Sequence, residues 1–189
     1  MITQFAYRAK PGTGSINVTD TSFSIYFSTS PYAPNTSGGN TLITSTFANN
    51  LGPDNTLVLS GGPGTLWSSP GSTGPGPCPF DMVFTLSTPF LYNPSKGFLL
   101  IDSHFNGYTG VGTGQFDVES FNSPGGSVAG VFNLTAGATT GAVQLSGNVV
   151  QFGYTLATPE PASWALILTG AAALGLVGRR RSGYNSRRS

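Results

Sequence analysis

Apolar and polar residues alternate along several short segments of the chain. Between residues 22 and 28, Phe23, Ile25 and Phe27 occupy every second position. Residues 80–86 repeat this pattern with four apolar side chains, again at every second position. A period of two is typical of a β-strand that buries one of its faces. Both segments are therefore predicted to be half-buried strands.

Further short segments rich in β-branched and aromatic residues predict more strands, separated by Gly, Pro, Asn and Ser. These segments are 41–47, 56–59, 97–105, 115–121, 128–134, 142–145 and 149–156. No segment before residue 159 shows a helical period. Many short strands with frequent turns favour an all-β, antiparallel sandwich or jelly-roll-like domain over residues 1–157.

Residues 61–79 differ from the predicted strands because they contain five prolines together with many Gly and Ser residues. Proline cannot donate a hydrogen bond to a sheet, so such a cluster indicates a loop. The sequence therefore predicts a long loop that carries Trp67 and is either an exposed functional loop or simply mobile.

Composition and charge narrow the class of protein. Only 8% of the 189 residues are charged, and 38% are hydrophobic, which is enough apolar material for a core. Residues 1–158 have three basic and six acidic side chains, whereas residues 159–189 have five arginines and one glutamate. The first part therefore lacks the basic surface expected of a nucleic-acid-binding protein.

The C-terminal segment combines three features in a fixed order. Pro159, Glu160 and Pro161 come first, an uncharged and mainly apolar run over 162–178 follows, and Arg179, Arg180 and Arg181 end it. As a helix, 17 residues would extend about 25 Å, the short limit for a bilayer core. The residues predicted to define this membrane helix are Ala162, Trp164, Leu166, Ile167, Leu168, Leu174, Leu176 and Val177. Arginines remain on the cytoplasmic side, so residues 1–157 are predicted to lie outside, as an ectodomain.

This order of features resembles the PEP-CTERM sorting domain of Gram-negative bacteria, with the likeness over residues 158–181 and a basic tail at 182–189. The resemblance implies an exosortase, a membrane-embedded cysteine transpeptidase-like enzyme, as partner. It implies cleavage near Pro159-Glu160-Pro161 after transient residence in the inner membrane. It also implies a cell-surface or extracellular protein of the biofilm matrix, with exopolysaccharide as a further partner.

Export also requires an N-terminal signal. Residues 1–10 lack the apolar core of a signal peptide, so we expect the natural start to lie upstream of Met1.

Candidate chemistry in the first 157 residues is sparse, and we expect no cofactor and no metal. Cys78 and His104 are the only residues of their types, which leaves no usual zinc-binding spacing. Asp102 shares strand parity with His104, but a Gly-x-Ser-x-Gly motif is absent, so a surface pair is predicted. Asp117 and Glu119 also share parity and are predicted to form a solvated side.

Two hypotheses for the ectodomain remain open, beside a third in which the chain is a cytosolic fragment without function because a signal peptide is missing. The first is a non-enzymatic structural or adhesive surface protein. The alternative is a carbohydrate-binding module or a weak glycoside hydrolase on the same fold, since aromatic rings stack on sugars and paired carboxylates hydrolyse them. One concave pocket that gathers aromatic and acidic residues would favour the alternative. The candidates are Trp67, Tyr92, Tyr108, Asp102, Asp117 and Glu119.

Overall fold

The computed structural model describes residues 1–34, 41–72, 74–120 and 128–156. Within these residues the backbone forms thirteen strands, one four-residue α-helix and one short 3-10 helix. Their bounds are β1 (Ile2–Tyr7), β2 (Ile16–Asp20), β3 (Phe23–Ser30), α1 (Phe47–Asn50), β4 (Thr56–Gly61), β5 (Thr65–Ser69), β6 (Met82–Phe90), η2 (Pro94–Lys96), β7 (Phe98–Phe105), β8 (Tyr108–Val111), β9 (Val118–Ser120), β10 (Gly130–Phe132), β11 (Ala142–Gln144), β12 (Ser146–Asn148) and β13 (Val150–Tyr154). The prediction of an all-β domain is therefore confirmed, because the described residues form antiparallel sheets and almost no helix.

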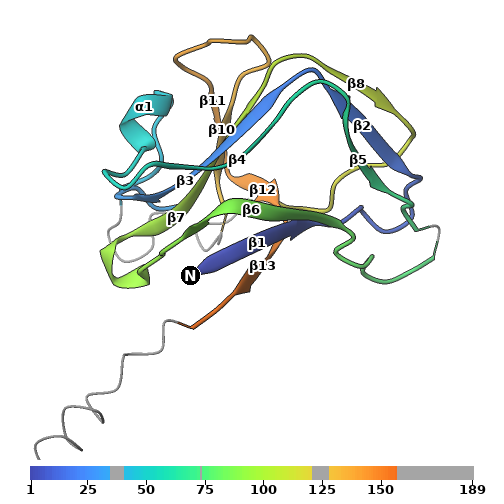
Figure 1. Cartoon of the computed structure of the whole chain (residues 1–189), viewed down its shortest axis with the longest axis horizontal. Helices are drawn as coiled ribbons and strands as arrows, with labels where there is room; N and C mark the ends of the chain where they lie inside the picture. The colour runs from blue at the N-terminus through green and yellow to red at the C-terminus, as the bar shows by residue number, and fades with distance from the viewer. Residues whose placement is uncertain (35–40, 73, 121–127, 157–189) are drawn as a thin grey trace, which may run out of the picture. The chain divides into compact units, whose positions relative to one another are not determined.

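The chain separates into two compact units, Met1–Thr155 and Leu156–Ser189, and only Leu156 of the second is described. In the first unit the strands form three three-stranded sheets, β13-β1-β6, β4-β3-β7 and β5-β2-β8, and the two-stranded sheets β10-β11 and β12-β9 (Figure 1). All these named strands pair antiparallel. Strands distant in sequence are thus neighbours, and β1 lies between β6 and the last strand, β13.

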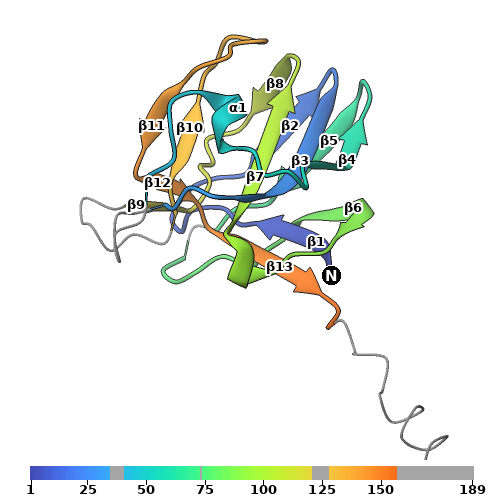
Figure 2. The ribbon, with the colours of Figure 1, turned by 90° about the vertical axis from the view of Figure 1, so that its left-hand side faces the viewer.

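The core lies between the β13-β1-β6 and β4-β3-β7 sheets, which face each other in Figure 2. Phe27 of β3 is fully buried, and its ring lies 5.6 Å from that of Phe5, 5.8 Å from Phe90 and 6.3 Å from Phe152. These three partners come from β1, β6 and β13, so one ring contacts every strand of the opposite sheet. The edge strands β6 and β4 of these two sheets are also joined, since the Ser87 hydroxyl donates to the Val58 carbonyl at 2.9 Å.

A second aromatic cluster corrects the prediction for residues 61–79. Trp67 does not lie in an exposed loop but on β5, which pairs with β2. Its ring lies 4.8 Å from Phe23, 5.1 Å from Phe84 and 5.4 Å from Phe105. The prolines were misleading because Pro63 and Pro70 flank this strand instead of interrupting it, and burial of the indole stabilises the pairing.

The predicted strands at 22–28 and 80–86 are confirmed as β3 and β6, and those at 56–59 and 97–105 as β4 and β7. The later predictions correspond to the shorter β9, β10, β11 and β13. The predicted strand at 41–47 is wrong, because only single bridges occur at Leu42 and Thr46 before α1 begins. Residues 44–46 instead wrap around Asn50, whose amide donates to the Thr44 carbonyl at 2.8 Å.

Strand β1 was missed because its apolar residues do not alternate. Ile2 and Phe5 are both buried although they lie three positions apart. The register of β1 shifts between Ile2 and Gln4 with respect to both neighbouring strands. Such a bulge rotates the strand by one position, so side chains of opposite parity reach the same core.

Candidate functional site

The last described strand ends beside the start of the first. In the register of β13 and β1, Tyr154 lies opposite Ile2, and Val150 lies opposite Tyr7. One residue further, the Thr155 amide donates to the Met1 carbonyl at 2.8 Å. Figures 1 and 2 both show the end of β13 close to the N-terminus. The C-terminal segment therefore leaves the domain directly from the end of a hydrogen-bonded strand.

The predicted sorting residues Pro159, Glu160 and Pro161 lie outside the described residues, and so do Arg179–Arg181. The same holds for the membrane-helix residues Ala162, Trp164, Leu166, Ile167, Leu168, Leu174, Leu176 and Val177. In the part of the chain that the structure covers, no helix has the length and apolar character needed to cross a membrane.

A cavity of about 610 Å³ opens among β7, β9, β12 and β13. Its volume falls within the range of small-molecule sites. Tyr92, Asp102 and Glu119, three of the residues named as candidates for a sugar site, line this one cavity. Most other lining side chains are apolar, including Ile101 and Phe152. The cavity could therefore hold a ligand with an apolar face and a few hydroxyl or cationic groups.

The polar groups of this cavity have defined partners. The Tyr92 hydroxyl donates to the Gly97 carbonyl at 2.9 Å. Asp102 Oδ2 lies 2.9 Å from His104 Nε2. Tyr7 also lines the cavity, and burial raises the pKa of its hydroxyl to about 12, so it remains a neutral donor near pH 7.

The Asp102–His104 pair occupies one side of β7, as their parity predicted. The His104 side chain is 58% exposed, and its ring contacts that of Tyr26 edge-on with the centroids 5.7 Å apart. This exposure agrees with the predicted surface pair.

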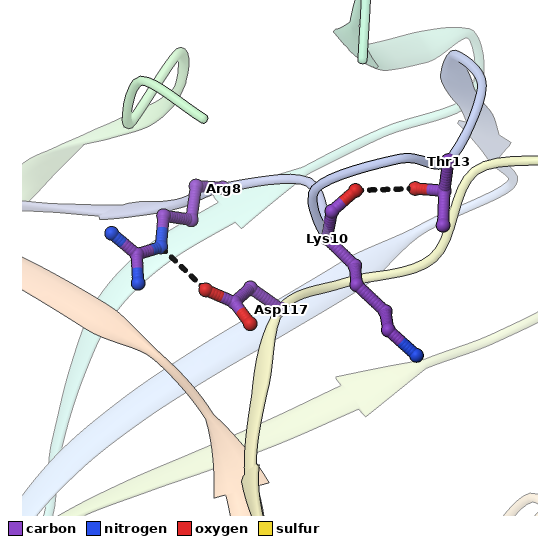
Figure 3. Close-up of polar contacts among 4 residues, drawn as sticks. All are labelled: Arg8, Lys10, Thr13 and Asp117. Atoms are coloured by element: carbon purple, nitrogen blue, oxygen red, sulfur yellow. Dashed lines mark hydrogen bonds and ion pairs between the residues drawn. The ribbon is translucent and has the colours of Figure 1, made fainter. Parts of the chain in front are cut away.

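The prediction for Asp117 and Glu119 is wrong in one respect, because these acids do not form a solvated side. The Asp117 side chain is only 19% exposed, and its Oδ2 accepts a hydrogen bond from Arg8 Nε at 2.7 Å (Figure 3). Glu119 is half-buried against the cavity, whereas Val118 between them is exposed. Parity correctly grouped the two acids but assigned them to the wrong face.

Arg8 and Asp117 also join two segments through the backbone. The Asp117 amide donates to the Arg8 carbonyl at 3.0 Å, and the Val149 amide donates to the Asp117 carbonyl at 2.9 Å. The Arg8 guanidinium lies 4.9 Å from the centre of the Phe80 ring. In the adjoining turn, the Thr13 hydroxyl donates to the Lys10 carbonyl at 2.7 Å (Figure 3). This region is therefore a structural clamp, and Asp117 does not line the cavity.

Trp67 and Asp117 do not line the cavity. Trp67 belongs to the aromatic core, and the side chain of Tyr108 is not among those described. Cys78 lies in the irregular segment before β6, and its free thiol is buried in the core. Within the described ranges, no group of three or more His, Cys, Asp or Glu residues is placed to hold a metal ion.

Sequence reasoning missed the most unusual acid in the domain. Asp20 at the end of β2 is buried, and neither of its carboxylate oxygens has a hydrogen-bond partner. Burial raises the pKa of this carboxyl above its ordinary value. The signal was present in the parity of Ile16, Val18 and Asp20, which places the acid on the core side of a strand.

The chain therefore consists of a β-rich domain, which ends at Thr155, and a C-terminal segment that follows it directly. Residues 157–181 match the family model described as the PEP-CTERM protein-sorting motif. The chain is thus a protein with a PEP-CTERM sorting segment, as predicted, and this segment is a C-terminal signal of the exosortase type. Such a signal indicates membrane transit and export to the cell surface of a Gram-negative bacterium. The chain has no match among curated proteins or among solved structures.

Proposed function

We propose that the chain is a non-enzymatic surface or matrix protein that an exosortase releases from the inner membrane by cleavage near Pro159-Glu160-Pro161. Residues 162–178 form the transient membrane helix, and Arg179–Arg181 hold its cytoplasmic end. The domain before them is a β-sandwich with a structural or adhesive role in the extracellular matrix, where exopolysaccharide surrounds it.

The match over residues 157–181 is the observation that carries this proposal. The charge pattern supports it, because an uncharged run followed by three arginines is the arrangement that orients a membrane segment. The domain adds support for a structural role. Its β13-β1-β6 and β4-β3-β7 sheets share one aromatic core, and its charged groups are few, with Asp117 paired to Arg8 and Asp102 to His104.

Replacement of Pro159, Glu160 and Pro161 by alanine tests the sorting function in a host that carries the processing enzyme. We expect the full-length chain to accumulate in the membrane fraction, with the domain still folded. A matched control replaces Tyr184, Asn185 and Ser186, which lie beyond the matched residues. Intact-mass analysis of membrane and medium fractions measures both outcomes. Equal release of the two variants would refute the proposal.

A carbohydrate-binding role is the second candidate, and one observation favours it. Tyr92, Asp102 and Glu119 come from separate segments of the chain and line the same cavity. An aromatic ring with two carboxyl groups offers stacking and hydrogen-bond acceptors for sugar hydroxyls. Trp67 and Asp117 lie elsewhere, which argues against the larger aromatic and acidic platform of a hydrolase.

The binding role is tested by co-sedimentation of the purified chain with exopolysaccharide from its native host. We expect Asp102→Asn with Glu119→Gln to weaken retention severalfold. Asp54→Asn is the matched control, because Asp54 binds Thr29 and does not line the cavity. Equal retention of both variants and the parent chain would exclude this cavity as the binding site.

A further inference from the structure

Asn106 and Gly107 form the only Asn-Gly pair in the sequence. They connect β7 to β8, where the backbone passes from the β4-β3-β7 sheet to the β5-β2-β8 sheet. Residues 21–22 connect β2 to β3 and run alongside, because β2 pairs with β8 and β3 pairs with β7. We call residues 21–22 and 106–107 the sheet corner.

Hydrogen bonds hold most of the backbone of the sheet corner. The Asn106 amide donates to the Ser22 carbonyl, and the Thr21 amide donates to the Gly107 carbonyl, both at 2.9 Å. The Thr21 hydroxyl also donates to the Gly107 carbonyl at 2.7 Å. Among the described residues, however, none accepts a hydrogen bond from the Gly107 amide. Asn106 and Gly107 are both exposed, so water reaches this unbonded N–H group.

The Gly107 nitrogen is the nearest backbone nucleophile to the side-chain carbonyl carbon of Asn106, Cγ. Its attack on Cγ closes a small ring, a succinimide, and such an intramolecular step is fast because the two groups are already on adjacent residues. A side chain on the second residue would obstruct the attack, and glycine has none. Gly107 has a φ of +85°, a conformation that glycine adopts at little cost. Residue type and backbone therefore both favour ring closure here.

We propose that Asn106 is a self-modification site, at which the folded domain converts a side-chain amide to a carboxylate with water as the only co-reactant. The Gly107 nitrogen gives up its proton and bonds to Asn106 Cγ, the bond from Cγ to Nδ2 breaks, and ammonia leaves with that proton. Water then opens the succinimide and restores the N–H group. Attack of water at Cγ gives isoaspartate only if the backbone bond has moved to the side chain, so the two products differ in which ring carbonyl water attacks. Attack at the former side-chain carbonyl gives aspartate, and attack at the former backbone carbonyl gives isoaspartate.

The reaction changes the sheet corner in charge and in hydrogen bonding. The Asn106 side-chain amide donates to Ser22 Oγ at 3.3 Å, and a carboxylate cannot donate this bond. The product adds a negative charge at neutral pH. Isoaspartate also adds a methylene group to the backbone, which displaces the carbonyls that Thr21 binds. The modification therefore loosens the connection between the two sheets, and it does so whether or not the chain is sorted as proposed above.

The test follows each asparagine in the purified full-length chain, kept folded in mild detergent and mildly alkaline buffer. Peptide mass mapping, with fragmentation that separates aspartate from isoaspartate, measures the conversion over time. Asn55 is the internal control, because it is exposed and is followed by Thr56, whose branched side chain obstructs the attack. Asn93 is a second control, since it is exposed and Pro94 has no N–H group. The same mapping in urea gives the rate in the unfolded chain.

We expect Asn106 to convert severalfold faster than Asn55 in the folded chain, and Asn93 not to convert by this route. The rate should rise with pH, because ring closure requires removal of the Gly107 amide proton. Asn106→Gln should abolish the conversion at this position on the same timescale, since the longer side chain requires a larger ring. An unchanged Asn106 in the folded chain would overturn the proposal, whether or not the chain in urea converts. Equal rates at Asn106 and Asn55 would also overturn it.

Discussion

Replacement of Phe27 by alanine is the most direct test of the shared core. The ring of Phe27 is fully buried and contacts Phe5, Phe90 and Phe152 across the two sheets. Truncation of a buried phenylalanine costs about 3–5 kcal/mol in lost burial and cavity formation. Three ring pairs depend on this one side chain, so we expect a loss near the upper end, about 5 kcal/mol. A domain with a typical stability of about 5–15 kcal/mol would lose a large part of it.

The free energy of unfolding is measured by urea titration of the purified chain, with near-ultraviolet circular dichroism as the signal. Phe132→Ala is the matched control, because the same side chain is 45% exposed on β10 and its removal should cost below about 1 kcal/mol. A loss for Phe27→Ala no larger than that of the control would refute the reasoning. The two sheets would then not depend on a common core.

Three further predictions concern charged groups. Asp20→Asn should raise stability at pH 7 by about 1–2 kcal/mol, because it removes an unpartnered buried charge. The raised pKa of Asp20 means that the parent loses stability as pH rises above 3.8, so titration at acidic pH should erase the difference. Burial alone would raise the pKa of Asp54, but hydrogen bonds from Thr29 lower it below 3.8. The ionised carboxylate therefore stabilises the parent at pH 7, and Asp54→Asn should lower the free energy of unfolding. This difference between parent and variant should vanish as the pH falls below 3.8. A double-mutant cycle of Arg8→Ala and Asp117→Ala should give a coupling of about 1–2 kcal/mol in urea denaturation, and additive losses would contradict the clamp.

Sequence alone could predict strands wherever one face is buried without interruption. Over residues 23–27 of β3 and 82–86 of β6 every second side chain is apolar and buried, because one face of each segment covers the core. In β1 the bulge between Ile2 and Gln4 breaks the period, so the pattern disappears although the strand is central to its sheet. The information needed to recognise β1 lies in its partner strands β6 and β13, whose paired residues come 75–88 and 143–152 positions later in the sequence.

The candidate site illustrates a second limit. Parity states which side chains share a face, but it does not state which face meets the rest of the domain. The apolar Val118 was expected to face the core and its neighbours Asp117 and Glu119 to face the solvent. Instead, Asp117 forms a salt bridge with Arg8, and Glu119 lines the cavity. Trp67 shows the converse, since its polar and proline-rich neighbours concealed a core residue. The sorting segment needed no such partners, because its signal lies in the local order of charge and apolar length.

The position of the junction restricts where processing can occur without loss of the fold. Five residues of β13 pair with β1, and Phe152 contributes a ring to the core against Phe27. A cut before Val150 would remove these contacts and leave β1 with an open edge, which is prone to aggregate with other chains. A cut after Thr155 removes none of them. The processing proposed near Pro159-Glu160-Pro161 would lie just beyond this limit, since the matched motif begins at residue 157, two residues after Thr155.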